Sequence, residues 1–188
     1  LLVGGSGNGD NDLLDGSVGA DTMVGLNGND TYVVDDAADV IVEAAGANTG
    51  TDTVNTALAA LSLAPYANVE NLTYTGADAD QFVGTGNALS NTITGGDLND
   101  TLSGLGGNDT LAGGLGADAM TGGDGDDVYF VDDAGDAVTE AALATSGVDR
   151  VEAAISYVLG ANVENLDLND GAVDGSGNTL ANVINGNG

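Results

Sequence analysis

The sequence of 188 residues contains no Cys and no His, and its only basic side chain is Arg150. Without Cys there is no disulfide framework, no thiolate metal ligand and no cysteine nucleophile. Without His and Lys, base catalysis by His, His-ligated zinc and Schiff-base chemistry are excluded. The residue types that remain restrict any metal site to oxygen ligands.

Positive charge is almost absent. Asp and Glu number 30 against one Lys or Arg, which gives a formal net charge of −29. Nucleic acids and anionic membranes are bound by basic surfaces, so we expect neither as a partner. No apolar run reaches membrane-spanning length and no basic-plus-apolar signal opens the chain, so we expect no membrane insertion. A bound cation would neutralise the carboxylates, and an oxygen-rich chain suits a hard ion such as Ca²⁺.

What the sequence does contain is a nine-residue repeat. Each block has Gly at position 1, Asp at position 6 and an apolar residue at position 8. Four blocks follow one another from Gly95: GGDLNDTLS (95–103), GLGGNDTLA (104–112), GGLGADAMT (113–121) and GGDGDDVYF (122–130). Two more, GSVGADTMV (16–24) and GLNGNDTYV (25–33), follow residues 4–15, which form one block lengthened by three residues.

A longer repeat encloses the short one. AALSLAPYANVENL (59–72) matches AAISYVLGANVENL (153–166), and GTGNALSNTITG (84–95) matches GSGNTLANVING (175–186). We therefore predict two units, 4–94 and 95–185, with residues 186–188 starting a further unit. Nonapeptides would occupy 4–42 and 95–139, and wider coils 43–94 and 140–185. We expect the chain to be part of a longer tandem-repeat protein.

The nonapeptide can be interpreted as a tight turn followed by a short strand. Gly permits positive φ in the turn, and the residue at position 8 points inward from the strand. Two nonapeptides make one coil, and stacked coils pair their strands in parallel and bury the apolar column. Aspartates two blocks apart then lie one above another. Their repulsion becomes coordination if a divalent ion lies between them.

These blocks resemble the glycine- and aspartate-rich nonapeptides of RTX proteins (repeats-in-toxin, hemolysin-type calcium-binding repeats), which follow G-G-x-G-x-D-x-U-x. The resemblance implies an all-β fold, a right-handed parallel β-roll or β-solenoid, with Ca²⁺ between turns n and n+2. It implies Asp ligands at Asp12, Asp21, Asp30, Asp100, Asp109, Asp118 and Asp127. It also implies backbone carbonyl ligands at Asn8, Asp10, Gly25, Asn27, Gly96, Leu98, Leu105, Gly107, Gly113, Leu115, Gly122 and Asp124.

The nine-residue phase continues past the blocks that have turn glycines. It reaches VDDAADVIV (34–42) and VDDAGDAVT (131–139), which place Asp39 and Asp136 at position 6. Each lies two blocks after another aspartate, Asp21 and Asp118 respectively. We hypothesise that Ca²⁺ also binds between these pairs. The alternative is that Asp39 and Asp136 only shape the turn that leaves the run.

Other acidic residues have less specific spacing. Glu43 and Glu140 could complete a calcium shell, although their spacing does not require it. Glu70 and Glu164 are expected to face solvent or cap a turn. Asp149 is expected to form a surface ion pair with Arg150.

Local signals outside the motif are weak. A short helix is one option around Leu58–Leu63. Tyr32 and Tyr129, at position 8, are expected in the core. Ser17, Leu26 and Leu105 replace glycine at position 2 of their blocks, which predicts looser turns there.

These features predict a calcium-binding structural module of a secreted bacterial protein that is not an enzyme. It would be a stalk, an adhesin segment or a matrix component that folds on calcium outside the cell, with neighbouring units, further copies or surface and matrix components as partners. The resemblance implies export by type I secretion. The alternative is the C-terminal folding and secretion module of an exported protease, lipase or polysaccharide-modifying enzyme. Paired carboxylates can hydrolyse glycosides, but here they recur in turns and not in one cleft.

Overall fold

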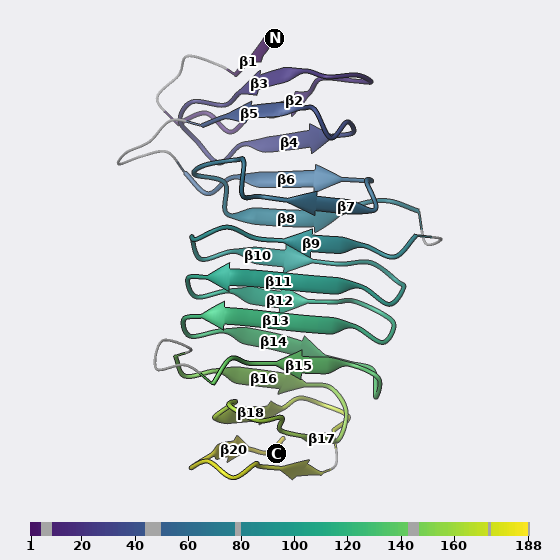
Figure 1. Cartoon of the computed structure of the whole chain (residues 1–188), viewed down its shortest axis with the longest axis vertical. Coiled ribbons are helices and arrows are strands. Elements are labelled where there is room, and N and C mark those ends of the chain that lie inside the picture. Colours follow the sequence, from purple (N-terminus) through teal and green to yellow (C-terminus); the bar gives the residue numbers. More distant parts are fainter. Residues whose placement is uncertain (5–8, 44–49, 78–79, 143–146, 173, 188) are drawn as a thin grey trace.

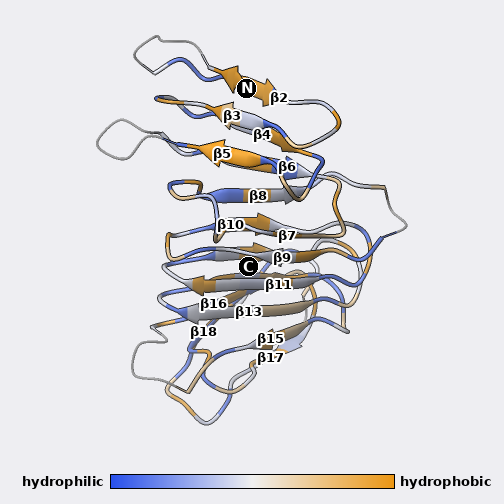
Figure 2. Cartoon of the chain, turned by 45° about the horizontal axis from the view of Figure 1, so that its top comes forward, coloured by the Kyte–Doolittle hydropathy of each residue, from blue (hydrophilic) through white to orange (hydrophobic). Residues whose placement is uncertain are grey.

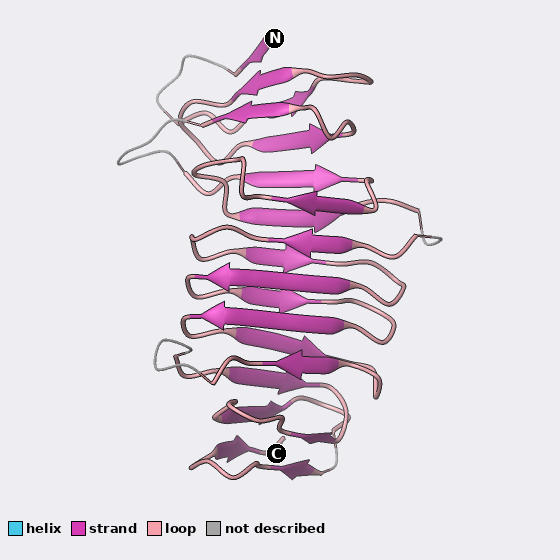
Figure 3. Cartoon of the chain, in the orientation of Figure 1, coloured by secondary structure: helices cyan, strands magenta, loops and turns pink. Residues whose placement is uncertain are grey.

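The computed structural model describes residues 1–4, 9–43, 50–77, 80–142, 147–172 and 174–187. Within these ranges the regular secondary structure consists of β-strands, and none of it is a helix that could cross a membrane. The strands stack along the long axis of the molecule, with the two chain ends at opposite ends of the stack (Figures 1 and 3). The fold is a parallel β-solenoid, as the repeats predict.

One sheet runs the length of the molecule. Its ten strands are the even-numbered ones, and each pairs in parallel with the next. They are β2 (Leu13–Asp15), β4 (Thr31–Val34), β6 (Thr53–Thr56), β8 (Asn71–Tyr74), β10 (Thr92–Thr94), β12 (Thr110–Ala112), β14 (Val128–Val131), β16 (Arg150–Ala153), β18 (Asn165–Leu168) and β20 (Val183–Asn185).

The opposite face is divided into three sheets of odd-numbered strands, which run in the opposite direction (Figure 1). The first contains β1 (Leu2–Val3), β3 (Thr22–Val24) and β5 (Val40–Val42). The second contains β7 (Ala60–Ser62), β9 (Val83–Thr85), β11 (Thr101–Gly106), β13 (Ala119–Asp124) and β15 (Ala137–Thr139). The third contains β17 (Tyr157–Val158) and β19 (Gly175–Ser176). Each coil therefore gives one strand to each face.

The register between coils follows the repeat length. In the nonapeptide runs, paired residues are 18 apart, as for Leu111 and Tyr129 in β12 and β14. The coil between β4 and β6 pairs Tyr32 with Val54, which are 22 apart. The coil between β16 and β18 pairs residues that are 15 apart. Coils of different length thus present their buried strand residue at the same level, because the additional or missing residues lie in the connections.

The core is a narrow column between the two faces. The residues at position 8 are almost fully buried, with Leu102 and Met120 each 1% exposed and Leu111, Tyr32 and Tyr129 each 0% exposed. Their strand neighbours point away from the core, as the two-residue period of a strand requires. In Figure 2 the hydrophobic colour lies mainly on strands such as β2 and β5.

Residues 58–63 do not form the short helix that was one option for them. They contain β7, which pairs in parallel with β9. Leu61 and Leu63 are buried at two-residue spacing, with 9% and 0% exposure. The weak helix propensity of this Ala- and Leu-rich segment is overridden because a strand buries both leucines in the column.

The expected ion pair between Arg150 and Asp149 is also absent. Arg150 instead contacts Glu152 at 3.1 Å and Asp167 at 3.5 Å. Asp149 is 0% exposed. Neighbouring residues of an extended chain point to opposite sides, so Asp149 points inward where Arg150 points outward.

Candidate metal sites

Polar residues form a continuous column along one edge of the ten-stranded sheet. Each lies two positions before the inward-facing apolar residue of its strand. We call this set the main column: Asp12, Asp30, Asp52, Glu70, Asn91, Asp109, Asp127, Asp149, Glu164 and Asn182. Its hydrogen bonds repeat from coil to coil, because the backbone N–H of one member donates to a carboxylate oxygen of the next. Seven such bonds have lengths of 2.7–2.9 Å.

A second column precedes the odd-numbered strands. Asp100 and Asp118 illustrate its geometry, since Asp100 N–H donates to Asp118 Oδ1 at 2.7 Å. The same bond joins Asp21 to Asp39 at 2.9 Å and Asp118 to Asp136 at 3.0 Å. The predicted aspartates are therefore brought together in pairs one coil apart.

These bonds occupy only one oxygen of each carboxylate. Among the residues that the structure describes, the Oδ2 atoms of six aspartates are buried and have no hydrogen-bond partner: Asp30, Asp52, Asp109, Asp118, Asp127 and Asp149. An unpaired buried carboxylate oxygen is costly in free energy unless a cation or a proton compensates it. These six aspartates therefore fit a hard cation that binds at the second oxygen of the carboxylate.

The glycines at position 1 leave room at these oxygens. A Cβ on Gly113 would overlap the Asp118 carboxylate, and a Cβ on Gly95 would overlap both Asp100 Oδ2 and the Gly113 carbonyl oxygen. The Asp100 carboxylate and the Gly113 carbonyl, both predicted ligands of one ion, thus converge on one point. Asp12 and the Gly25 carbonyl converge in the same way on Gly4. Asn8, another predicted ligand, lies outside the described residues.

Asp39 and Asp136 differ from the six aspartates with an unpartnered oxygen, because both of their carboxylate oxygens are hydrogen-bonded. Asp136 Oδ2 accepts from the backbone N–H groups of Asp132 at 3.0 Å and Asp133 at 3.1 Å. Asp39 Oδ2 accepts from the corresponding pair at 3.3 Å. This geometry fits the turn-forming alternative for Asp39 and Asp136, and their role as calcium ligands stays a prediction. Asp100 of the nonapeptides is bonded in the same way, because it accepts from the backbone N–H groups of Phe82 and Gly96.

Outside the nonapeptide runs, asparagine side chains take the place of the aspartates. Asn91 Nδ2 donates to the Glu70 carbonyl at 3.0 Å, and Asn87 Nδ2 donates to the Val69 carbonyl at 2.8 Å. Asn182 and Asn178 bond in the same way to Glu164 and Val163. An amide N–H therefore satisfies carbonyl oxygens that would otherwise need a cation, so these turns require no metal.

The sequence analysis missed two aspartates of the main column, Asp52 and Asp149. Their signal is an aspartate two positions before a buried valine, Val54 or Val151, which repeats the D-x-apolar phase of the nonapeptide. They were missed because their coils are longer than two nonapeptides, which puts them out of phase with the preceding blocks. Glu70 and Glu164 belong to the same ladder of bonds between coils, since their carboxylates accept the backbone N–H groups of Asp52 and Asp149.

Burial is the main electrostatic influence on these groups in the metal-free chain. It raises the pKa of Asp109 and Asp149 to about 7, and that of Asp52, Asp118 and Asp127 to about 6. It raises the pKa of Glu140 to about 8, to which the charges of Asp149 and Asp127 also contribute. Without a cation, these carboxylates therefore take up protons near neutral pH.

The comparisons with known proteins agree with this geometry. The family model of the RTX calcium-binding nonapeptide repeat (4 copies) matches residues 2–41, 85–120 and 94–129. These matches contain eight of the nine predicted ligand aspartates and leave out Asp136. Neither a curated protein nor a solved structure matched the chain. The matched repeats identify RTX calcium-binding nonapeptide repeats in this chain, and the all-strand solenoid and the buried carboxylate columns agree with them.

Proposed function

We propose that this chain is a calcium-dependent structural module of a secreted bacterial protein, without catalytic activity of its own. The observation that supports this most directly is the set of six buried, unpartnered Oδ2 atoms in a chain with one basic side chain. The fold places carboxylates where only an external cation or protons can compensate them. Ca²⁺ suits these positions because it accepts six to eight oxygen ligands in flexible geometry.

Calcium would couple folding to the extracellular environment. Extracellular calcium modules bind at roughly 10⁻⁴–10⁻³ M, far above cytosolic calcium. A site that exists only in the folded chain contributes its binding free energy to folding. The chain would then remain unfolded during export and fold on reaching calcium outside the cell.

The shape supports a role as a spacer. The coils stack in one direction, and the ten-stranded sheet continues from one end to the other (Figure 1). Each further coil would lengthen such a stack without changing its cross-section, as in other repeat proteins. A stalk, an adhesin segment or a matrix component would use this geometry, with neighbouring units as the first partners.

A chain that folds on binding calcium would also suit a second role, as the C-terminal folding and secretion module of an exported enzyme. The full coding sequence distinguishes the two roles. Further repeat units would favour the structural array, and an adjoining catalytic domain would favour the enzyme module.

Circular dichroism of the full chain tests calcium dependence. At neutral pH we expect a coil-like spectrum after calcium is removed and a β-rich spectrum in millimolar Ca²⁺. Mg²⁺ should substitute poorly because it requires a small, regular octahedron and releases water reluctantly. If the calcium-free chain kept its full β signal and melting temperature at neutral pH, the proposed function would be wrong.

A further inference from the structure

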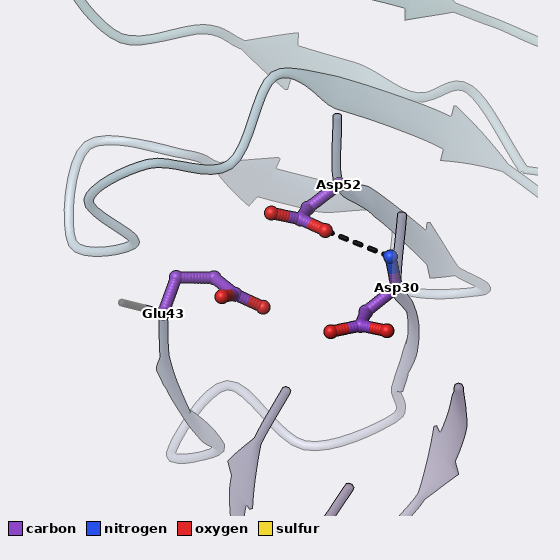
Figure 4. Close-up of side chains that lie close together, drawn as sticks. All are labelled: Asp30, Glu43 and Asp52. Atoms are coloured by element: carbon purple, nitrogen blue, oxygen red, sulfur yellow. Dashed lines mark hydrogen bonds between the residues drawn. The ribbon is translucent and has the colours of Figure 1, made fainter. Parts of the chain in front are cut away.

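Each nonapeptide run ends at a cluster of three carboxylates that joins one aspartate of the nonapeptide motif to two acidic residues outside it, and all of these residues are buried except the half-buried Glu43. The clusters are Asp30, Glu43 and Asp52 in the first run, and Asp127, Glu140 and Asp149 in the second. In each, one carboxylate oxygen per residue lies within 4.8 Å of the other two. Figure 4 shows the first cluster, whose side chains turn toward a common space. We call these clusters the terminal triads.

The two terminal triads are built in the same way. The Glu stands at the same sequence distance from its two aspartates in both triads. Stacking places the two aspartates in adjacent coils, where Asp30 N–H donates to Asp52 Oδ1 at 2.7 Å and Asp127 N–H donates to Asp149 Oδ1 at 2.9 Å. The Glu enters from the segment that leaves the run. The triad thus adds a third carboxylate to a pair of stacked aspartates.

Burial and hydrogen bonding leave four carboxylate oxygens of the terminal triads without a partner. Asp52 and Asp149 are 0% exposed, and the Oδ2 atom of each is buried without a hydrogen-bond partner. Asp30 and Asp127 have the same unpartnered oxygen. Each triad therefore contains two buried carboxylate oxygens that accept no hydrogen bond. In the first triad, Asp30 Oδ2 and Glu43 Oε1 converge on the point where a Cβ on Gly25 would lie.

The position of the Glu is fixed by a tyrosine. Tyr32 OH donates to Glu43 Oε1, and Tyr129 OH donates to Glu140 Oε1. The facing residue in the second triad is Gly122, where a Cβ would overlap both Tyr129 OH and Asp127 Oδ2. A side chain at that position would fill the space among the carboxylates. Glycine and tyrosine together hold the third carboxylate next to the aspartate pair.

The chain itself cannot neutralise three carboxylates in one place. Its only basic side chain, Arg150, contacts Glu152 and Asp167. The three oxygens lie within 4.8 Å of one another, and two oxygens bound to one ion at a Ca–O distance of about 2.4 Å are at most about 4.8 Å apart, so the separations are compatible with one shared ion. Carboxylate ligands alone select a hard cation.

We propose that the terminal triads are calcium sites of a second type, which hold Ca²⁺ more tightly than the two-aspartate nonapeptide sites and close each run. The proposal rests on the proposed function, because it assumes that the nonapeptides bind calcium. The greater affinity follows from the third carboxylate, since affinity for Ca²⁺ rises with the charge of the ligand set. Glu43, Asp52, Glu140 and Asp149 thereby become ligands.

Terbium provides a probe for these sites, because Tb³⁺ replaces Ca²⁺ and emits when a nearby tyrosine is excited. Tyr129 hydrogen-bonds to the second triad, whereas Leu102, Leu111 and Met120 occupy position 8 in the blocks before it. Titration of the full chain with Tb³⁺ should show an early, tyrosine-sensitised stage. Glu140→Gln should weaken one tight site on the order of tenfold and leave the first triad as an internal control. Glu43→Gln with Glu140→Gln should remove the whole early stage.

Calorimetry with Ca²⁺ alone gives the second measurement. The matched control is Asp118→Asn, which removes a carboxylate from a nonapeptide site and should spare the tight stage. If Glu140→Gln and the double variant keep the wild-type ion count and affinities, the triads hold no ion and the proposal is overturned. A wild-type chain that binds no calcium would instead overturn the proposed function. Glutamine matches glutamate in size and still accepts from tyrosine, so these variants should keep the fold.

Discussion

The metal-free chain should lose stability as the pH rises toward neutral, and calcium should reverse the sign of this dependence. In the metal-free fold, burial raises carboxyl pKa values above their ordinary values of 3.8 for Asp and 4.5 for Glu. A raised folded-state pKa costs nothing below the unfolded pKa, where both states are protonated. The cost is fully present above the folded pKa, so stability falls as the pH rises between these two values.

The size of the effect follows from the shifted groups. At pH 6 the folded chain holds protons mostly on Asp109, Asp149 and Glu140, and about half the time on three further aspartates with pKa values of about 6. The unfolded chain holds almost none there, so folding takes up about four protons. At 1.36 kcal/mol per proton, the free energy of unfolding should fall by ~5 kcal/mol per pH unit near pH 6. A typical domain has only about 5–15 kcal/mol, so the metal-free fold should not persist above neutral pH.

Bound calcium gives the opposite dependence. The ligand carboxylates bind the ion only when ionised, so calcium depresses their folded-state pKa. The stabilisation is then present above the unfolded pKa of roughly 3.9 and is lost as the pH falls below it. Acid should therefore unfold the calcium form, at higher pH when calcium is scarce.

Urea unfolding followed by far-UV circular dichroism measures both dependences. The metal-free sample is prepared on a chelating resin, because soluble chelators weaken in acid. The proton number comes from the slope of the unfolding free energy between about pH 5 and pH 7. Asp109→Asn with Asp149→Asn should reduce that number by about two, since asparagine mimics the protonated state. Metal-free stability that stays constant or rises over this range would contradict the predicted proton uptake, and an acid midpoint indifferent to calcium would contradict the predicted ligand role.

Three further predictions concern single positions. Leu105 has a φ of +78°, which disfavours any residue with a Cβ. Leu105→Gly should therefore raise the free energy of unfolding by about 1 kcal/mol in saturating calcium, and a loss of stability would contradict this. Asn91 is 2% exposed and donates to the Glu70 carbonyl, which then needs no metal. Asn91→Ala should lower the free energy of unfolding by about 1–3 kcal/mol, while calorimetry should find the same number of calcium ions. Both carboxylate oxygens of Asp136 are hydrogen-bonded, so Asp136→Asn should leave the number of bound calcium ions unchanged, whereas Asp118→Asn should lower it. The loss of an ion in Asp136→Asn would instead establish a calcium site between Asp118 and Asp136.

The coil and its repeated parts could be predicted from the order of the amino acids alone. The nine-residue phase of glycine, aspartate and an apolar residue predicted the strands at Leu102, Leu111 and Met120, their burial, and the stacking of residues 18 apart. This worked because each nonapeptide combines its turn and its strand in a few adjacent residues, so local chemistry and the repeat lead to the same structure. The absence of His, Cys and Lys similarly limited the metal to one bound by oxygen.

The residues outside the strict phase that join the columns became apparent only in the folded chain. The spacing along the main column differs between Asp30 and Asp52, between Asp52 and Glu70, and between Asp149 and Glu164, so no constant period finds all of them. The position of each polar residue along the stack is set by the apolar residue that follows it into the core. Which apolar residue is buried depends on the coils above and below. The third carboxylate of each terminal triad, Glu43 or Glu140, follows the last odd-numbered strand of its run. Such a meeting depends on the path of the connection, which the spacing of residues along the chain does not specify.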